Sequence, residues 1–317
     1  MPSHEQTKTT TSAGSISTAI PADRIAHPHR TGHGAAAVLL ILIAIVCAIA
    51  WRDTNIPRLH DVTVAVPGLA HRIDVLQVTD LGGQRFGQGQ SRLATLIAGK
   101  HYDTIVLTGD MAEDLTFDPV WELTDVLRSH SSRIWYLQGN HDFPSLGVEM
   151  AQHGIPSLPA TGAVALAGWD PQAVDVALVY GRDTPSISAA KGKGRQLALI
   201  ASHTPPSESR LVAGQTLGPG LHFFIAGHTH GGQIRLPFVG ALGAPLSWPE
   251  EERLPARQNE ITFLPELQRP QRYVDGMYDR GNQRIFVARG LDSNTGKFRF
   301  ACQAEIVAYH FVPGATR

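Results

Sequence analysis

The chain is poor in cysteine: its 317 residues include only Cys47 and Cys302. Two cysteines so far apart argue against a disulfide framework, and they leave the redox compartment undetermined. The chain also lacks a charge excess, because 27 Lys and Arg residues stand against 28 Asp and Glu residues, for a formal net charge of -1. Without a basic stripe, nucleic acid is not expected as a partner. The length suits one large domain with additional segments.

Long apolar runs are scarce, and the clearest one lies near the N-terminus. Residues 35–51 read AAAVLLILIAIVCAIAW, a 17-residue run at the lower limit for crossing a bilayer. Residues 1–34 are rich in Ser, Thr, Pro, Gly and His and predict a disordered tail. We therefore expect a tail over 1–34, a single transmembrane anchor over 35–51 and a folded domain over 54–317. A cleaved signal peptide and a buried core helix are the alternatives.

The orientation of this anchor is not decided by the flanking charges. Arg24 and Arg30 precede the apolar run, and Arg52 and Arg58 follow it, so the positive-inside rule gives a tie. A short tail before a single anchor usually stays inside the cell. We therefore expect a single-pass protein of the cell membrane with its large domain outside the cytoplasm.

Five β-like runs end in Asp, Asn or His. Extended backbone directs residues i and i+2 to the same side, so His228 and His230 could face one site. In open α/β sheets ligands bind at the C-terminal ends of the strands. Oxygen donors mixed with imidazole suit Mn, Fe or Zn. The runs are Ile73–Thr79 before Asp80, Thr104–Thr108 before Asp110, Ile134–Gln138 before Asn140, Gln196–Ser202 before His203, and Leu221–Ala226 before His228.

Each of these polar residues also has a purely structural interpretation. Asp80 and Asp110 could stabilise turns at strand ends. Asn140 could cap a following helix, and His203 could be a hydrogen-bonded core residue. For any one residue alone the structural interpretation is favoured. The ordered set at five strand ends favours a metal site instead.

The order of these motifs resembles the calcineurin-like metallophosphoesterase superfamily, in particular its membrane-anchored bacterial branch. The resemblance covers Ile56 to Phe311 and rests on these segments: DLG at Asp80, GD at Asp110, GNHD at Asn140, the lone His203, GHTHGGQIRLP at His228, and VARGL at Gly290. It implies an α/β fold, a two-sheet β-sandwich flanked by helices in four layers. It also implies hydrolysis of a phosphoester substrate by a hydroxide bound to two divalent metal ions, Mn, Fe or Zn.

The resemblance assigns a role to each motif residue. It implies two metal sites that share Asp110 as the bridging carboxylate; Asp80 and His230 complete the first site, and Asn140, His203 and His228 complete the second. It implies that His141 is catalytic, either steadying phosphate charge or protonating the leaving oxygen. Glu113 and Asp142 are implied as carboxylates behind these groups, Glu113 as one that holds His141 in place.

One position departs from the family pattern. The first motif usually reads Asp-x-His, but here Gly82 stands where the histidine is expected. Three explanations are open: another side chain, such as Gln84, Gln90 or Asp114, replaces it; the first site is weak and prefers a harder ion such as Mn or Mg; or activity is lost.

We expect a phosphodiesterase or phosphomonoesterase, and the predicted anchor suggests a lipid-linked phosphate as substrate. The alternative function is a catalytically weakened or inactive membrane-tethered protein that binds metal or another ligand, because Gly82 replaces the histidine.

The remaining pattern predicts further strands and helices around these motifs. We expect an edge strand over Leu59–Val66, helices over Ser91–Lys100 and Asp118–His130, a strand over Val174–Tyr180, a loop-rich region over Gly240–Tyr278, and closing strands over Ile285–Ala288 and Phe298–Phe311. Asp118 is expected to be the N-cap of its helix, with Pro119 in the first turn.

Overall fold

A computed structural model gives the arrangement of most of the chain. It describes residues 31–112, 115–158, 162–165, 176–180, 196–207, 210–212, 215, 219–236, 240–241, 273–293 and 298–315. The chain forms two compact units, Met1–Ile43 and Ala44–Arg317. Most of the predicted loop-rich region lies outside the described residues.

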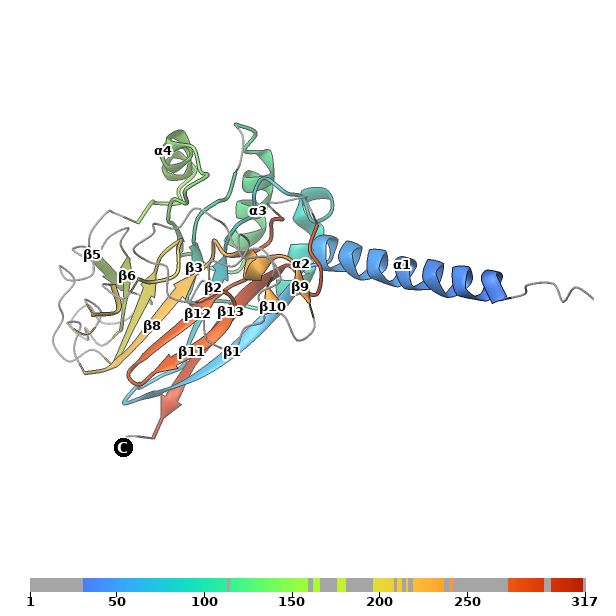
Figure 1. The fold of residues 1–317 in the computed structure, drawn as a ribbon. Coiled ribbons are helices and arrows are strands. Elements are labelled where there is room, and N and C mark those ends of the chain that lie inside the picture. Colours follow the sequence, from blue (N-terminus) through green and yellow to red (C-terminus); the bar gives the residue numbers. More distant parts are fainter. Residues whose placement is uncertain are drawn as a thin grey trace, which may run out of the picture. The chain divides into compact units, whose positions relative to one another are not determined.

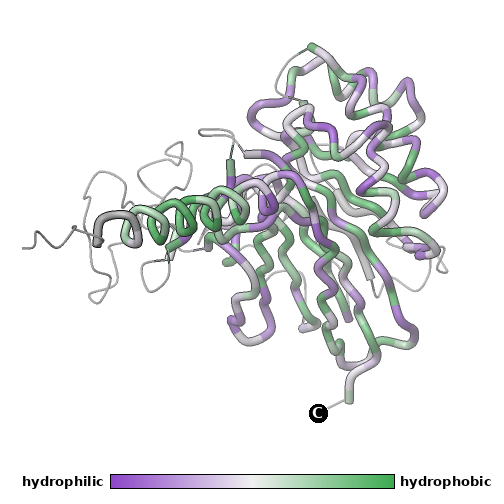
Figure 2. The backbone as a smooth tube through the Cα atoms, turned by 90° about the vertical axis from the view of Figure 1, so that its right-hand side faces the viewer, coloured by the Kyte–Doolittle hydropathy of each residue, from purple (hydrophilic) through white to green (hydrophobic). Residues whose placement is uncertain are grey.

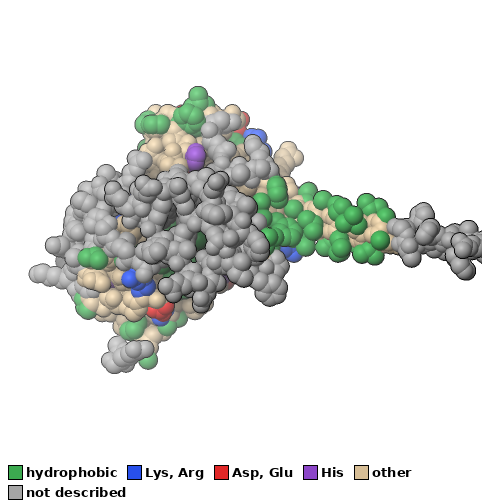
Figure 3. All heavy atoms as spheres, in the orientation of Figure 1, with side chains coloured by type: hydrophobic (Ala, Val, Ile, Leu, Met, Phe, Trp, Pro, Cys, Tyr) green, Lys and Arg blue, Asp and Glu red, His purple; other side chains and the backbone are tan. Residues whose placement is uncertain are grey.

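The N-terminal helix α1 runs from Thr31 to Asn55 and contains the whole apolar run. Its segment Gly34–Asn55 is long and apolar enough to cross a membrane, a property that a signal sequence near the N-terminus shares. Figures 2 and 3 show apolar residues along nearly its whole described length. The last turn belongs to the second unit, where the buried carboxylate of Asp53 accepts a hydrogen bond from Cys302 N at 3.1 Å.

The second unit contains two large sheets (Figure 1). The first has the order β1-β13-β2-β3-β4, in which β13 runs antiparallel to β2 and the other neighbouring pairs are parallel. Its strands are β1 (Arg58–Pro67), β13 (Glu305–Gly314), β2 (Ile73–Val78), β3 (Thr104–Leu107) and β4 (Ile134–Tyr136). The predicted edge strand is confirmed, because β1 covers it and lies at the edge of this sheet.

The second large sheet has the order β11-β12-β8-β7-β6-β5. Its central pairs are parallel, and its two outer pairs are antiparallel. Its strands are β11 (Gly276–Arg280), β12 (Gln283–Val287), β8 (Leu221–Ala226), β7 (Leu197–Ala201), β6 (Val176–Tyr180) and β5 (Gly162–Ala165). A small hairpin pairs β9 (Arg235–Leu236) with β10 (Gly240–Ala241).

The two sheets pack face to face through a shared apolar core. Val106 of β3 and Tyr309 of β13 belong to the same buried cluster as Leu199 of β7 and Phe223 of β8. The rings of Phe223 and Tyr309 meet edge to face, with centroids 5.4 Å apart. Burial of such side chains stabilises a protein by about 1.5–3 kcal/mol each, so this core fixes the sheets against each other.

Helices cover the outer face of the first sheet. They are α2 (Ser91–Ile97), α3 (Asp118–Arg128) and α4 (Pro144–Gln152), with the short 3-10 segments η1 (Gln88–Gln90) before α2 and η3 (His230–Gly232) in the loop after β8. Leu93, Leu123 and Met150 place all three helices in one buried cluster with that sheet. The predicted fold class is confirmed: the protein is mixed α/β with two main sheets flanked by helices.

Several element boundaries differ from the sequence prediction. The helix α2 ends at Ile97 because Ala98 turns to extended backbone and Gly99 adopts a φ of 71°. The prediction of Asp118 as N-cap was wrong: the N-cap is Phe117, and Asp118 is the first helical residue. An acidic residue in the first turn still interacts favourably with the helix dipole. The helix α4 was not predicted.

Candidate metal centre

The predicted metal ligands lie just after the carboxyl ends of strands from both sheets. Asp80, Asp110 and Asn140 follow β2, β3 and β4 of the first sheet, whereas His203 and His228 follow β7 and β8 of the second. Neighbouring parallel strands direct their carboxyl ends to one edge, which brings these loops together.

The backbone of these loops is held in a conformation that is uncommon for residues with side chains. In the part of the chain that the structure describes, seven non-glycine residues have positive φ, and four of them are predicted ligands: Asp80, Asp110, His228 and His230, with φ between 50° and 68°. Such conformations are unfavourable and cluster at functional sites, where the surrounding structure enforces them. The occurrence of positive φ at four predicted ligands indicates that the fold holds their side chains in fixed directions at a cost in local backbone energy.

The donors of the predicted second site converge on the Nε2 atom of His203. This atom lies 3.0 Å from Asp110 Oδ2, 2.9 Å from Asn140 Oδ1 and 3.1 Å from His228 Nδ1. The other ring nitrogen of His203 lies 2.9 Å from the carbonyl oxygen of Thr108. A proton on that nitrogen leaves the Nε2 lone pair free for a metal, the arrangement found behind most histidine ligands. One carboxylate, one amide oxygen and two imidazoles within such a small volume form a donor set that fits a divalent ion.

The ionisable groups of this cluster are buried and close together, and both conditions shift their pKa values. Burial lowers the pKa of His228 to about 4, and the neighbouring His203 lowers it further. Burial would also lower the pKa of His203, but the hydrogen bond and charge of Asp110 outweigh it and raise the pKa to about 9. The same contact outweighs burial at Asp110 and lowers its pKa to about 2. Without a bound cation, a proton on His203 therefore balances the charge of Asp110, and a cation bound there would take the place of that proton.

The predicted first site contains Asp80 and His230. The Asp80 carboxylate accepts hydrogen bonds from His228 N, at 3.1 and 3.0 Å, and from the Thr79 hydroxyl at 2.9 Å. His230 Nε2 lies 4.0 Å from Asp80 Oδ1, about twice a metal–ligand bond of about 2 Å. The His230 Nδ1 atom lies 3.1 Å from the carbonyl oxygen of Asp292, which directs Nε2 toward Asp80. These two residues thus fit one ion between them.

Burial shifts the pKa of both residues of this site toward the neutral form. Burial raises the pKa of Asp80 to about 6. Burial and the nearby Arg299 guanidinium lower the pKa of His230 to about 3. A buried carboxylate and a neutral imidazole are groups that gain from a cation between them.

Asp142, predicted to stand behind the ligands, holds two of their loops together. Its Oδ2 accepts hydrogen bonds from Asp110 N, Gly139 N and the Tyr136 hydroxyl, each at 2.8 Å. Its Oδ1 accepts from Met111 N at 2.6 Å and from Ala112 N at 3.1 Å. One buried side chain thus accepts from four backbone donors in the loops after β3 and β4 and from the Tyr136 hydroxyl of β4, which fixes the position of Asp110.

His141 occupies a different position from the predicted ligands. Its backbone N donates to Asp110 Oδ1 at 2.8 Å, but its side chain is exposed. An exposed imidazole at the edge of a buried donor cluster is accessible to a substrate. Glu113, predicted to hold His141 in place, lies outside the described residues, as does Asp114.

Two of the three side chains named as replacements for the missing histidine, Gln84 and Gln90, form other hydrogen bonds. The Gln90 amide binds the backbone of its own loop and of Pro119, so it holds structure. The Gln84 amide donates to Asp292 Oδ1. Asp292 follows β12, and its side chain fills the space beside Gly82. Sequence reasoning missed it, although it directly follows the phrase VARGL at a strand end.

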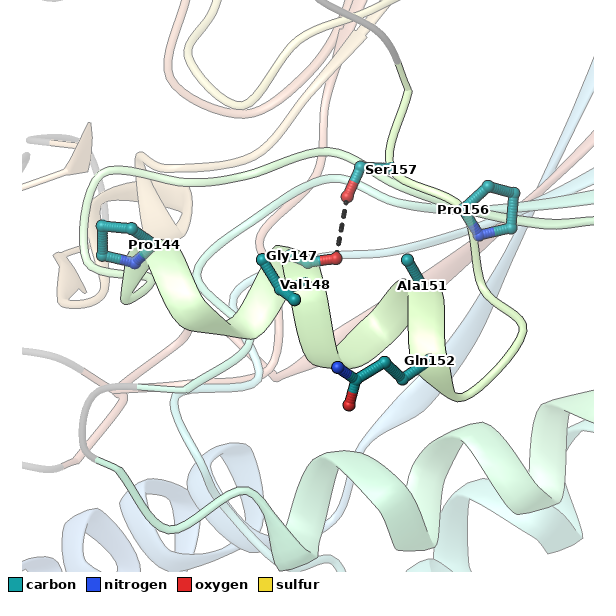
Figure 4. Close-up of a pocket in the computed structure, with 7 residues that line it drawn as sticks. All are labelled: Pro144, Gly147, Val148, Ala151, Gln152, Pro156 and Ser157. Carbon is teal, nitrogen blue, oxygen red and sulfur yellow. Dashed lines mark hydrogen bonds between the residues drawn. The ribbon is translucent and has the colours of Figure 1, made fainter.

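A separate shallow pocket lies along α4 (Figure 4). It is lined by Pro144, Gly147, Val148, Ala151, Gln152, Pro156 and Ser157, and the Ser157 hydroxyl donates to Gly147 O across it. None of the predicted ligands lines this pocket, so it is distinct from the donor cluster.

Comparison with known proteins agrees with this geometry. A model of the calcineurin-like phosphoesterase family matches residues 73–232, which include every predicted ligand. The chain is also similar to "Uncharacterized metallophosphoesterase YkuE" of Bacillus subtilis (strain 168), with 25% identity over 218 residues, or 65% of this chain and 67% of the relative.

Proposed function

The chain belongs to the calcineurin-like phosphoesterase family, and on this premise we propose that it hydrolyses phosphoesters at a membrane through a two-ion site. Family membership makes it a hydrolase of phosphoric ester bonds that depends on metal. The finer proposal assigns Asp80, Asp110 and His230 to one ion. It assigns Asn140, His203, His228 and the shared Asp110 to the other.

The observation that carries this proposal is the convergence of donors from both sheets. The Asp110 side chain contacts His203 through Oδ2 and the His141 amide through Oδ1. A pair of bound cations would supply activated water and draw charge from the phosphate oxygens. Other residues of the chain orient the proposed ligands: the Thr108 carbonyl sets the tautomer of His203, and Asp142 fixes the Asp110 loop.

His141 is proposed to act on the substrate directly. Its exposed ring lies next in sequence to the ligand Asn140, so a phosphoester bound at the cluster would lie within its reach. We assign it to stabilising phosphate charge or to protonating the leaving oxygen. The proton would pass from the imidazole to the ester oxygen as the bond to phosphorus breaks.

The substrate is proposed to be a lipid-linked phosphate. Two observations support an apolar group on the substrate. The N-terminal helix is long and apolar enough to span a membrane. The α4 pocket, with Pro144, Val148 and Ala151 in its lining, begins three residues after His141. A diester or monoester joined to a hydrophobic tail suits this combination.

The helix is proposed to be retained as an anchor, with the domain outside the cytoplasm. Its last turn is part of the folded domain, since the fully buried Asp53 accepts Ala304 N at 2.9 Å through its carbonyl and Cys302 N through its carboxylate. Cleavage after the apolar run would fall beside these contacts, which favours retention. The proposed orientation keeps the short tail inside.

The experiment compares Asp110→Asn with wild type as full chain in detergent. Hydrolysis of bis-p-nitrophenyl phosphate and p-nitrophenyl phosphate is measured with Mn, Mg, Fe, Zn or Co, and bound metal is counted. We expect activity to fall at least about a hundredfold and both ions to weaken, because one carboxylate serves both. The matched control is Asp279→Asn, which removes a largely exposed carboxylate paired with Arg284. Near-normal turnover in Asp110→Asn would refute the two-ion site.

The alternative, a metal-binding protein without activity, rests on Gly82. The structure shows that the space beside Gly82 is filled by another carboxylate, which is unlike a decayed site. Folded wild-type protein that binds ions and cleaves neither ester with any metal would favour the alternative.

A further inference from the structure

We propose that Asp292 is a metal ligand that replaces the histidine missing at position 82. This inference rests on the two-ion function proposed above and deepens it. In the family pattern the imidazole comes from the loop after the strand that carries Asp80. Here the carboxylate comes instead from the loop after β12, on the other sheet.

The first argument is steric replacement. A Cβ atom built on Gly82 would lie 2.6 Å from Asp292 Oδ2 and 2.8 Å from Asp292 Cβ. Carbon atoms do not approach other side chains so closely, so the Asp292 carboxyl occupies the start of the space that a side chain at 82 would use. The glycine at position 82 therefore leaves the space that the Asp292 carboxylate fills.

The second argument is the position of the Asp292 backbone between the two predicted ligands of the first site. Asp292 N donates to the carbonyl oxygen of Asp80 at 2.5 Å. Asp292 O lies 3.1 Å from His230 Nδ1 and accepts its hydrogen bond when that nitrogen is protonated. One residue thus contacts both partners of the proposed ion.

The third argument concerns the burial and orientation of the carboxylate. Only 5% of Asp292 is exposed, and a carboxylate buried to this extent gains from a cation beside it. The Gln84 amide binds Oδ1, and Oδ2 is the oxygen nearest the Gly82 position. Gln84 thereby orients the carboxylate, as an outer partner does for a metal ligand.

A structural role as the counter-ion of Arg299 is the competing explanation. Arg299 is fully buried, and its Nε donates to the main-chain oxygen of Asp292 at 2.8 Å. Its other amino groups donate to the carbonyl oxygens of Arg289 and His230. The guanidinium therefore binds the backbone of the loop, and the carboxylate lies beside Gly82.

The replacement changes the chemistry of the first site. A neutral imidazole is exchanged for an anionic oxygen, so the site holds Asp80, Asp110, Asp292 and one histidine, His230. Carboxylates suit hard ions, whereas imidazole suits Zn. We therefore infer that this first site selects Mn or Mg over Zn more strongly than a site with a histidine at position 82 would.

The test counts metal rather than activity. The full chain is purified in detergent, stripped with chelator, and titrated with Mn, with stoichiometry and Kd measured by elemental analysis and calorimetry. We expect two ions in wild type and in the control Asp279→Asn. In Asp292→Asn we expect one ion, or a second bound at least tenfold more weakly. Two ions at unchanged affinity in Asp292→Asn would overturn the proposal and leave the proposed function intact.

A double variant keeps the proposal testable if Asp292→Asn does not fold. Gly82→His with Asp292→Gly restores the family arrangement and removes the clash. Histidine is among the residues that tolerate the φ of 57° at position 82. We expect two ions again, with the Zn-to-Mn affinity ratio raised at least tenfold. An unchanged ratio would overturn the inference. Absence of bound metal in wild type would instead overturn the proposed function itself.

Discussion

The variant Asp142→Asn tests how the site is held in place. The wild-type carboxylate accepts five hydrogen bonds, two on Oδ1 and three on Oδ2. An amide keeps one oxygen and replaces the other with a donor. Its best orientation keeps the oxygen on the Oδ2 side, so Met111 N and Ala112 N face an NH2 group.

The expected loss of stability follows from these two donors. Each buried donor left without an acceptor costs about 1–3 kcal/mol, so Asp142→Asn is expected to cost about 2–6 kcal/mol. That is a large part of the 5–15 kcal/mol typical of whole proteins. The control Tyr136→Phe removes a single hydrogen bond to the same carboxylate and is expected to cost about 1 kcal/mol.

The assay is urea unfolding of the full chain in detergent, followed by tryptophan fluorescence. A chelator is present throughout so that loss of bound metal does not contribute to the difference. A loss below about 1 kcal/mol in Asp142→Asn, or no more than in Tyr136→Phe, would refute the assignment of Asp142 as the residue that joins the two loops.

Two further predictions concern other contacts. Burial would raise the pKa of Glu305, but His60 and Arg58 outweigh it and lower the pKa to about 2. Its ionised form therefore stabilises the fold by about 3 kcal/mol above pH 4.5, and this is lost as the pH falls toward 2. The unfolding free energies of wild type and Glu305→Gln should converge between pH 5 and pH 2; a constant difference would contradict this. A Cβ on Gly227 would collide with Thr79 Oγ1 and Asp80 Oδ2, so we expect Gly227→Ala to lose one ion by metal analysis, and two retained ions would argue against that packing.

The fold class could be predicted because its evidence is local in sequence. Each run such as Thr104–Thr108 combines β-branched and apolar residues with a polar residue at its end. The structure confirms these strands as neighbours, as with β2 and β3. The predicted closing strand over Phe298–Phe311 begins only at Glu305, because the residues before it follow hydrogen bonds to the helix end at Asp53 and Thr54.

The donor cluster around His203 was predicted in composition but not in detail. Motif order identified Asp110, Asn140 and His228 as its neighbours, and the structure brings these side chains together. The metal-binding roles themselves stay predictions. Asp292 was missed because a residue that replaces a ligand in space leaves no trace near Gly82 in the sequence. The replacement depends on β12 and β2 delivering their loops to one place, and only tertiary structure shows this.

Because His203 and His228 come from one sheet and Asp110 and Asn140 from the other, an ion held by all four would couple folding to metal supply. Each binding event would favour the docked sandwich over any state in which the sheets separate. At a free ion concentration one hundred times the Kd, this linkage adds about 2.7 kcal/mol to stability. The cell's metal pool would then set how long the protein survives as well as how fast it works. Protein made under metal starvation would be the population most exposed to proteolysis.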